Sequence, residues 1–264
     1  MNINVTADKL RTMRLVGMAE AYDRQRTDPT SAELSFDQRL ALLVESQWIH
    51  EDNRALQRRL AYAKLRHNAS IEQINWRHPR RLSRELIDQL RTSEWVRHGQ
   101  NCLITGATGI GKSWLACALA QKACRDGYRT LYLYSPKFFR ELLAANADGS
   151  LTKMVRRLGR LDLLVVDDWG MEVAKRAQYR DFLELVDERH GRTATLITSQ
   201  YPPENWLDIV GDPTVGDAIV DRLTHEAYRI DLVGKSMRGN DPPSPSGKPD
   251  GKPAKSGPQH PGEA

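Results

Sequence analysis

The chain has 264 residues, of which 40% are hydrophobic and 28% are charged, and a mass of 30.0 kDa. This composition allows a sizeable packed core and excludes wholesale disorder. The longest strongly apolar run, Leu163–Val166, is much too short to cross a bilayer, and the first residues show no secretory signal. Three cysteines without a C-x-x-C pair and seven scattered histidines suggest neither a disulfide framework nor a zinc site. We therefore expect a soluble, reduced, intracellular protein without a membrane partner.

Positive charge is concentrated in residues 54–84, although the net charge of the whole chain is only +5. This segment contains nine basic residues and one acid, Glu72, so its charge is +8 and the rest of the chain sums to −3. The basic residues are Arg54, Arg58, Arg59, Lys64, Arg66, Arg77, Arg80, Arg81 and Arg84. Such a local excess favours a polyanionic partner, above all nucleic acid, over a merely solvated helix surface.

The N-terminal third is predicted to be helical. Ser35 and Gln38 have the spacing of a capping box, and a second such box lies at Ser70–Gln73. An apolar run with helical spacing follows the first box and predicts a packed helix face. The run consists of Leu40, Leu43, Val44, Trp48, Leu56, Leu60 and Ala63. We place a domain junction between residues 69 and 70, next to the second box.

A helix over residues 54–66 has one apolar and one cationic face. Leu56, Leu60 and Ala63 share one stripe, because successive residues are rotated by about 100°. The opposite face carries Tyr62 among four arginines, which we expect to bind DNA phosphates. These arginines are Arg54, Arg58, Arg59 and Arg66.

From about Trp95, short apolar runs alternate with helical stretches. Five runs are predicted strands, namely Cys102–Thr105, Thr130–Leu133, Leu163–Val166, Ala194–Ile197 and Tyr228–Leu232. Continuous apolar strands joined by helical crossovers predict an α/β fold with a mostly parallel sheet covered on both faces. The proline-rich residues 240–264 have no large apolar side chain, so we expect a disordered tail after a domain of residues 70–239.

A phosphate-binding motif follows the first predicted strand and leads into a predicted helix, Ser113–Arg125. Its sequence, G-A-T-G-I-G-K-S, matches the P-loop pattern G-x-x-x-x-G-K-[ST]. Glycines let successive backbone N–H groups surround phosphates at a helix N-terminus, Lys112 would reach the β- and γ-phosphates, and the Ser113 hydroxyl would bind Mg²⁺. The predicted ATP-binding residues are Gly106, Ala107, Thr108, Gly109, Ile110, Gly111, Lys112 and Ser113.

The acid pair, Asp167 and Asp168, follows the buried third predicted strand. α/β sheets bind their ligands at this end of the strands, so Asp167 is predicted to hold the Mg²⁺ shell. Asp168 could orient and deprotonate an attacking water. The strand predicted between the two motifs is typical of P-loop ATPases that carry their own catalytic acid. A nucleotide kinase would need a lid and an acceptor pocket, for which the sequence gives no support.

Five motifs in this order resemble the DnaC/IstB-like branch of the AAA+ ATPases, and are most similar to the IstB transposition helper proteins. They are the P-loop, Val165–Gly170, Ile197–Gln200, Asp221–Leu223 and Gly234–Arg238. The resemblance covers residues 1 to about 239. It implies a P-loop AAA+ ATPase with a five-stranded parallel sheet, preceded by a small all-α N-terminal domain for DNA binding and oligomerisation.

The resemblance also implies roles for individual residues. Gln200, or alternatively Ser199, matches sensor 1, Arg222 matches the arginine finger that acts on a neighbouring subunit, and Arg238 matches sensor 2. Asp168 is one methylene shorter than the glutamate of most AAA+ proteins, which predicts slow hydrolysis.

The function implied is that of an Mg²⁺-dependent ATPase of the bacterial cytoplasm. It would form a homo-oligomer with ATP on double-stranded DNA and prepare target DNA for a cognate transposase. The alternative is a helicase loader, which needs an apolar docking face for its helicase. The basic segment from Arg54 to Arg84 favours the transposition helper.

Overall fold

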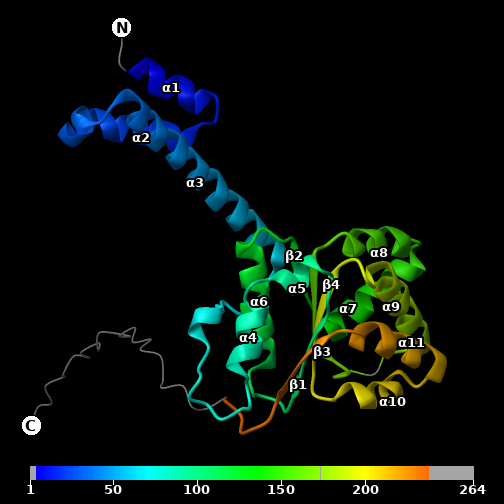
Figure 1. The fold of residues 1–264 in the computed structure, drawn as a ribbon. Helices are drawn as coiled ribbons and strands as arrows, with labels where there is room; N and C mark the ends of the chain where they lie inside the picture. The colour runs from blue at the N-terminus through cyan, green and yellow to red at the C-terminus, as the bar shows by residue number, and fades with distance from the viewer. Residues whose placement is uncertain (1–3, 173, 238–264) are drawn as a thin grey trace, which may run out of the picture.

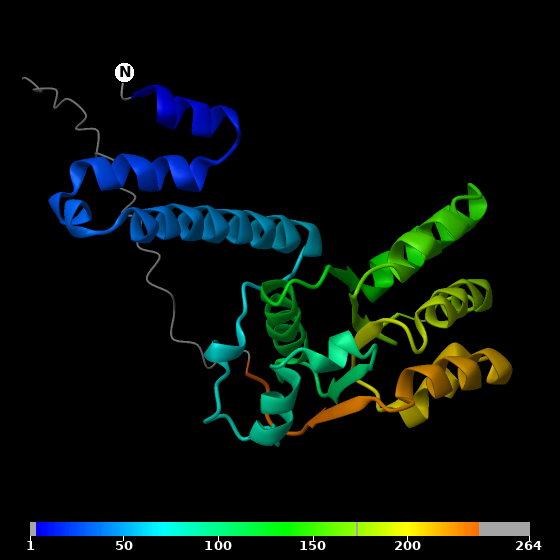
Figure 2. The ribbon, with the colours of Figure 1, turned by 45° about the horizontal axis from the view of Figure 1, so that its top comes forward.

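The computed structural model describes residues 4–172 and 174–237 (Figure 1). Three helices, α1 (Asn4–Thr12), α2 (Val16–Thr27) and α3 (Phe36–Ala63), form an N-terminal arm, with a short 3₁₀ turn, η1 (Pro29–Glu33), between the last two. Figure 2 shows α3 running from this arm to an α/β body. Within the described residues, no helix is long and apolar enough to span a membrane. Arg238 and the predicted tail lie outside the described residues.

The predicted capping box begins α3 as expected. The Ser35 hydroxyl accepts the N–H of Gln38 at 3.3 Å, and Gln38 Oε1 accepts the N–H of Ser35 at 2.9 Å. The helix ends at Ala63, because Lys64 takes a left-handed conformation with φ of 50°. The prediction of a helix over residues 54–66 is therefore wrong at the C-terminal end, because α3 ends at Ala63 and Arg66 lies beyond it.

The N-terminal half of α3 carries an apolar stripe that the described residues do not cover. Phe36, Leu40, Val44 and Trp48 recur every four residues and are exposed, Trp48 by 74%. Instead, α2 packs on another side of α3, where a Cβ at Gly17 would lie 2.5 Å from the Ser46 carbonyl oxygen. The apolar run predicted from the sequence therefore divides, because Leu40, Val44 and Trp48 are exposed whereas Ala63 at the end of α3 is buried.

Five parallel strands form the centre of the α/β body in the order β2-β3-β4-β1-β5. The strands are β1 (Cys102–Gly106), β2 (Thr130–Tyr134), β3 (Leu163–Trp169), β4 (Ala194–Ser199) and β5 (Tyr228–Leu232). All five predicted strands are present, and the predicted fold class is confirmed. Because the strands are parallel, the segments that follow β1, β3 and β4 all leave the sheet on the same side, at the carboxyl-terminal ends of the strands.

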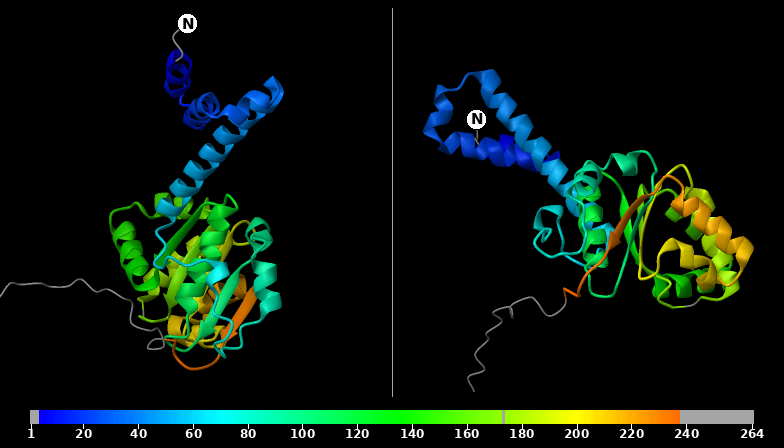
Figure 3. Two further views of the ribbon diagram at one scale, coloured as in Figure 1. Left: turned by 90° about the vertical axis from the view of Figure 1, so that its left-hand side faces the viewer. Right: turned by 60° about the horizontal axis from the view of Figure 1, so that its bottom comes forward.

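Helices cover both faces of the sheet (Figure 3). One face packs against α4 (Arg84–Leu90), α5 (Glu94–Arg97) and α6 (Lys112–Arg125). The other packs against α7 (Ser135–Ala147), α8 (Leu151–Gly159), α9 (Arg176–Arg189), α10 (Trp206–Val210) and α11 (Pro213–Thr224). Alternation along β3 divides its side chains between these two cores, since Val165 joins the first and Leu164 and Val166 join the second. The three cysteines are buried.

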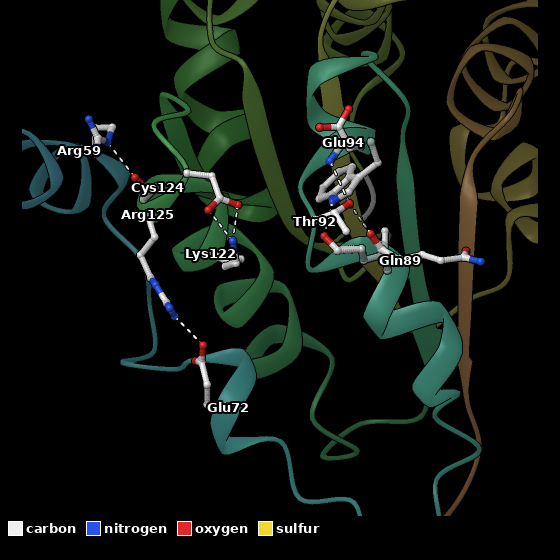
Figure 4. A network of polar contacts seen from close by, with 11 residues as sticks. Arg59, Glu72, Gln89, Thr92, Glu94, Lys122, Cys124 and Arg125 are labelled. Carbon is white, nitrogen blue, oxygen red and sulfur yellow. Dashed lines mark hydrogen bonds and ion pairs between the residues drawn. The ribbon is translucent and has the colours of Figure 1, made fainter. Parts of the chain in front are cut away.

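The base of the arm is fastened to α6 (Figure 4). Arg59 of α3 donates from Nε to the carbonyl oxygen of Cys124 at 2.7 Å. Arg125 donates to Glu72 at 2.8 Å, a hydrogen bond that lowers the pKa of Glu72 to about 2. Glu72 lies in a short 3₁₀ turn, η2 (Ile71–Gln73), so the segment that contains the predicted domain junction is held at both ends.

Candidate nucleotide-binding site

The P-loop connects β1 to α6 through a backbone that requires glycine. Gly109 and Gly111 have φ of 81° and 96°, which glycine adopts without steric cost. A Cβ at Gly106 would lie only 2.4 Å from the carbonyl oxygen of Leu232. This conformation places successive N–H groups around the N-terminus of α6, where the helix dipole favours an anion.

The charge of Lys112 is held within this loop. Its Nζ donates to the carbonyl oxygens of Gly106 at 2.8 Å and Ala107 at 3.0 Å, and the residue is only 5% exposed. Ser113 follows in the first turn of α6, partly exposed. The structure thus brings together the ammonium, the hydroxyl and the backbone N–H groups that phosphate binding needs.

Asp167 is a fully buried acid of the site. Its residue is 0% exposed, its Oδ1 accepts a hydrogen bond from Thr198 Oγ1 at 2.6 Å, and its Oδ2 accepts one from the Tyr132 hydroxyl. Burial and the neighbouring carboxylate raise the pKa of Tyr132, which keeps that hydroxyl a donor. Three neighbouring strands, β2, β3 and β4, therefore fix the orientation of one carboxylate.

Asp168 points differently because the strand is interrupted there. The pairing of β3 with β4 shifts register between Val166 and Trp169, and Asp168 has a left-handed φ of 60°. A bulge of this kind re-aims a side chain and is common beside active sites. The Asp168 carboxylate is accordingly 18% exposed, while that of Asp167 is 0% exposed.

Thr198 links the two acids and was missed from the sequence. Besides its bond to Asp167, its Oγ1 accepts the backbone N–H of Asp168 at 2.9 Å. Neither predicted sensor residue makes such a contact, since Ser199 donates to the carbonyl oxygen of Trp169 at 2.9 Å and Gln200 is exposed. A polar residue just before the end of β4 was the available signal.

Arg66 also lies at the acid pair. Its Nη1 is 3.7 Å from an oxygen of Asp167 and 3.7 Å from one of Asp168, and its guanidinium stands 5.6 Å from the ring centre of Tyr134. A hydrogen bond with Tyr132 and the nearby acids raise the pKa of Arg66. The structure thus places Arg66 at the acid pair and not on the cationic face of α3, and its expected contact with DNA stays a prediction.

Arg222 lies at the amino-terminal ends of the strands, whereas the P-loop of its own chain lies at their carboxyl-terminal ends. It lies in the last turn of α11, pairs with Asp187 of α9 and donates from Nη1 to the Ala218 carbonyl oxygen at 2.9 Å. The carbonyl oxygen of Arg222 accepts a hydrogen bond from Asn101 Nδ2 at 3.0 Å. Asn101 precedes β1 and the P-loop follows β1, so the two lie at opposite ends of this strand. Arg222 therefore lies away from the P-loop of its own chain.

The C-terminal motif reaches the P-loop. The N–H of Met237 donates to the carbonyl oxygen of Gly109 at 2.8 Å. Arg238, the predicted sensor 2 residue, is the next residue along the chain and lies outside the described residues.

The donor set of the site fits a nucleotide with Mg²⁺. The Asp167 carboxylate and the Ser113 hydroxyl are oxygen ligands of the kind that Mg²⁺ prefers, and Lys112 supplies the charge for phosphate. A metal here would take over the neutralisation of the acid pair that Arg66 provides.

Comparison with known proteins decides the family. Residues 8–242 match the family described as IstB-like ATP binding protein. The chain belongs to this family. It is 45% identical to the insertion sequence ATP-binding protein y4pL of Sinorhizobium fredii over 89% of this chain and 96% of that protein. It is 41% identical to the ATP-binding protein of insertion sequence IS1162 from Pseudomonas fluorescens, over 75% of this chain and 86% of that one.

Solved structures show the same AAA+ fold in replication proteins. The DnaC helicase loader superposes with a TM-score of 0.54 at 19% identity, covering 65% of this chain and all of that one, 100%. DnaI gives a TM-score of 0.52 at 19% identity, over 63% and 92% of the two chains. The IstB-like chain is therefore an ATP-binding protein of insertion-sequence type with a DnaC-like AAA+ fold.

The position of Arg66 predicts that it competes with Mg²⁺ for the acid pair. Arg66→Ala should lower the Mg²⁺ concentration that half-saturates binding of a fluorescent ATP analogue by about threefold, a small effect because the guanidinium is half exposed. The salt dependence of DNA binding should stay unchanged. Arg54→Ala, which removes an exposed arginine of α3, is the control and should leave the Mg²⁺ dependence as it is. An unaltered Mg²⁺ requirement in Arg66→Ala would contradict this prediction.

Proposed function

We propose that this IstB-like protein is an ATP-hydrolysing oligomer that binds double-stranded DNA and prepares target DNA for a cognate transposase. The observation that carries the proposal is one basic groove built jointly by the arm and the α/β body. The curated relatives are named as insertion sequence ATP-binding proteins, which supports the link to transposition. We also keep residues 1–69 and 70–239 as the proposed division into an arm domain and an ATPase domain.

The basic groove runs between α3 and α8 and has a volume of about 970 Å³. Seven of its lining residues are basic, and among the residues that line it none is acidic. The basic residues are Arg58, Arg59, Arg129, Lys153, Arg156, Arg157 and Arg160. Tyr62 adds an exposed aromatic ring. The cationic face of α3 forms one wall of this groove and α8 forms the other.

A groove of this composition suits a phosphate backbone. Long cationic side chains on two walls can neutralise successive phosphates, and each contact releases counterions without reading the base sequence. Arg59 has its Nε engaged by Cys124, which keeps the side chain in place at the floor of the groove. DNA bound here would contact both parts of the protein at once.

The chemistry at the nucleotide follows from the residues of the site. Lys112 and the P-loop N–H groups bind the phosphates, and Asp167 and Ser113 would hold Mg²⁺, which supplies charge neutralisation at the phosphates. Asp168 re-aimed by the bulge orients the attacking water and accepts its proton. Hydrolysis then requires a second cation on the γ-phosphate, which Arg222 of a neighbouring subunit supplies.

A helicase loader is the second candidate, and a specific feature favours it. The exposed stripe of Phe36, Leu40, Val44 and Trp48 is an apolar docking face of the kind that a loader needs. The insertion-sequence relatives and the basic groove together favour the transposition helper.

Asp168→Asn tests the proposed hydrolysis. The variant keeps the metal ligand Asp167, so it should bind ATP within about threefold of the wild type, while steady-state hydrolysis falls by about 100-fold. Lys112→Ala serves as the binding-deficient comparison and should lose nucleotide affinity as well. Hydrolysis at the wild-type rate in Asp168→Asn would remove the general-base role.

Arg222→Ala tests the proposed action between subunits. Its homo-oligomer should bind ATP but hydrolyse it at least about 100-fold more slowly. Mixing it with Lys112→Ala subunits should restore part of the activity, because some interfaces then pair an intact P-loop with an intact arginine. If Arg222→Ala alone hydrolyses ATP like the wild type at all protein concentrations, Arg222 is not the finger.

The basic groove is tested by removing charge from its α8 wall alone and from both walls together. Arg156→Ala/Arg157→Ala and Arg58→Ala/Lys153→Ala should each weaken binding to unrelated duplexes almost equally and flatten the salt slope by up to about two units. Arg91→Ala/Arg97→Ala removes two exposed arginines outside the groove and should change neither quantity. Fluorescence anisotropy at stepped salt measures both. Unchanged slopes in both groove variants would place the DNA elsewhere.

A further inference from the structure

Arg80 is a buried arginine directly behind the P-loop. It precedes α4, it is only 2% exposed, and its Nη1 donates to the carbonyl oxygen of Ile110 at 3.1 Å. The same nitrogen lies 3.3 Å from Met237 Sδ of the C-terminal motif. One side chain thus touches the P-loop and the last described segment.

The guanidinium takes the space that a side chain on the P-loop would need. A Cβ at Gly111 would lie 2.5 Å from Arg80 Nη1. Arg80 is held there from the other side, since its carbonyl oxygen accepts the N–H of Val233 at 3.2 Å. A Cβ at Gly234 would lie 2.4 Å from the Pro79 carbonyl oxygen, so the two segments pack backbone to backbone.

The charge of Arg80 is poorly compensated by the described residues. Its Nε has no hydrogen-bond partner among them, and none of their carboxylates forms an ion pair with it. Burial alone lowers the pKa of the guanidinium. Burying a charge without a counter-charge is costly, so the fold retains an unfavourable group at this place.

Arg189 is a second buried arginine, with a structural role, and the chain provides hydrogen-bond partners for its guanidinium. It is also 2% exposed, but Nε donates to Thr195 Oγ1 at 3.0 Å and Nη1 donates to the carbonyl oxygens of Leu158 and Leu161 at 2.6 and 3.0 Å. Its Nη2 donates to the carbonyl oxygen of Ala194. The contrast indicates that Arg80 is matched to something other than the described residues of the protein.

We propose that Arg80 is a positioning residue for the nucleotide phosphates, a fixed positive charge behind the P-loop whose counter-charge is the bound polyphosphate. The inference rests on the nucleotide site of the proposed function. Arg80 acts through the loop, because its bond to Ile110 and its contact with Gly111 set the curvature of the backbone that meets the phosphates. Its charge adds to that of Lys112 from the protein side, where water does not screen it.

Two substitutions separate charge from packing. Arg80→Met keeps an unbranched side chain without charge, and Arg80→Lys keeps the charge without the planar guanidinium. Arg81→Met removes the same charge from the next, exposed residue and is the matched control. Calorimetric titration of each purified full chain with ATP, ADP and adenosine, and the melting temperature before and after ATP, are the measurements.

Arg80→Met should bind ATP and ADP about tenfold more weakly, with adenosine binding unchanged, because only the phosphates respond to the lost charge. Its melting temperature without nucleotide should equal or exceed that of the wild type, while the increase on adding ATP becomes smaller. Arg80→Lys should recover most of the ATP affinity. Arg81→Met should match the wild type throughout.

The opposite pattern would overturn the inference. A lower melting temperature without nucleotide, combined with wild-type ATP affinity in Arg80→Met, would make Arg80 a structural residue only. Wild-type ATP affinity in both Arg80→Met and Arg80→Lys would have the same meaning. Failure of the wild-type chain itself to bind ATP would instead contradict the nucleotide site, so the two failures are distinguishable.

Discussion

Burial of the Asp167 carboxylate constrains the rest of this structure. An ionised carboxylate without solvent must be hydrogen-bonded or paired, because an isolated charge is far too costly in the protein interior. Tyr132 on β2 and Thr198 on β4 donate to it from the two adjoining strands, and Arg66 provides the nearby positive charge. The register of three strands and the path of the chain after α3 are thus tied to a single side chain.

The sequence predicted the fold well because its signals were local. Four of the strands are short and largely apolar runs, β5 alternates apolar and charged residues, and the P-loop lies where a strand leads into a helix. A polar residue near the end of β4 was the local signal for Thr198, but its contacts with Asp167 and Asp168 could not be predicted locally, since only strand pairing brings these residues together. The bulge at Asp168 likewise has no local signal, because nothing in a short apolar run indicates a register shift.

The apolar and basic patterns of the sequence identified groups of similar side chains, but they did not show where in the structure these side chains lie. Helical spacing identified an apolar stripe on α3 but could not show whether this chain or another covers it, and Trp48 is exposed. The count of nine basic residues treated them as one surface. The structure separates them, with Arg58 in the basic groove, Arg66 at the acid pair and Arg80 buried behind the P-loop. Charge counts do not distinguish a solvated arginine from a buried one.

The short distance along the chain between Arg58 and Arg66 gives this separation a mechanical consequence. Arg58, Arg59 and Tyr62 line the groove from the last turns of α3, and Arg66 reaches the acid pair just after the helix ends. A helix transmits displacement along its length with little loss, and the left-handed Lys64 fixes the direction in which the chain leaves it. Arg66 follows the end of α3 by only three residues, so the proposed DNA groove and the acid pair lie on one short stretch of chain. If phosphates draw the end of α3 toward α8, the displacement is passed to Arg66 through this short segment, and the nucleotide state and DNA binding can be coupled in this way.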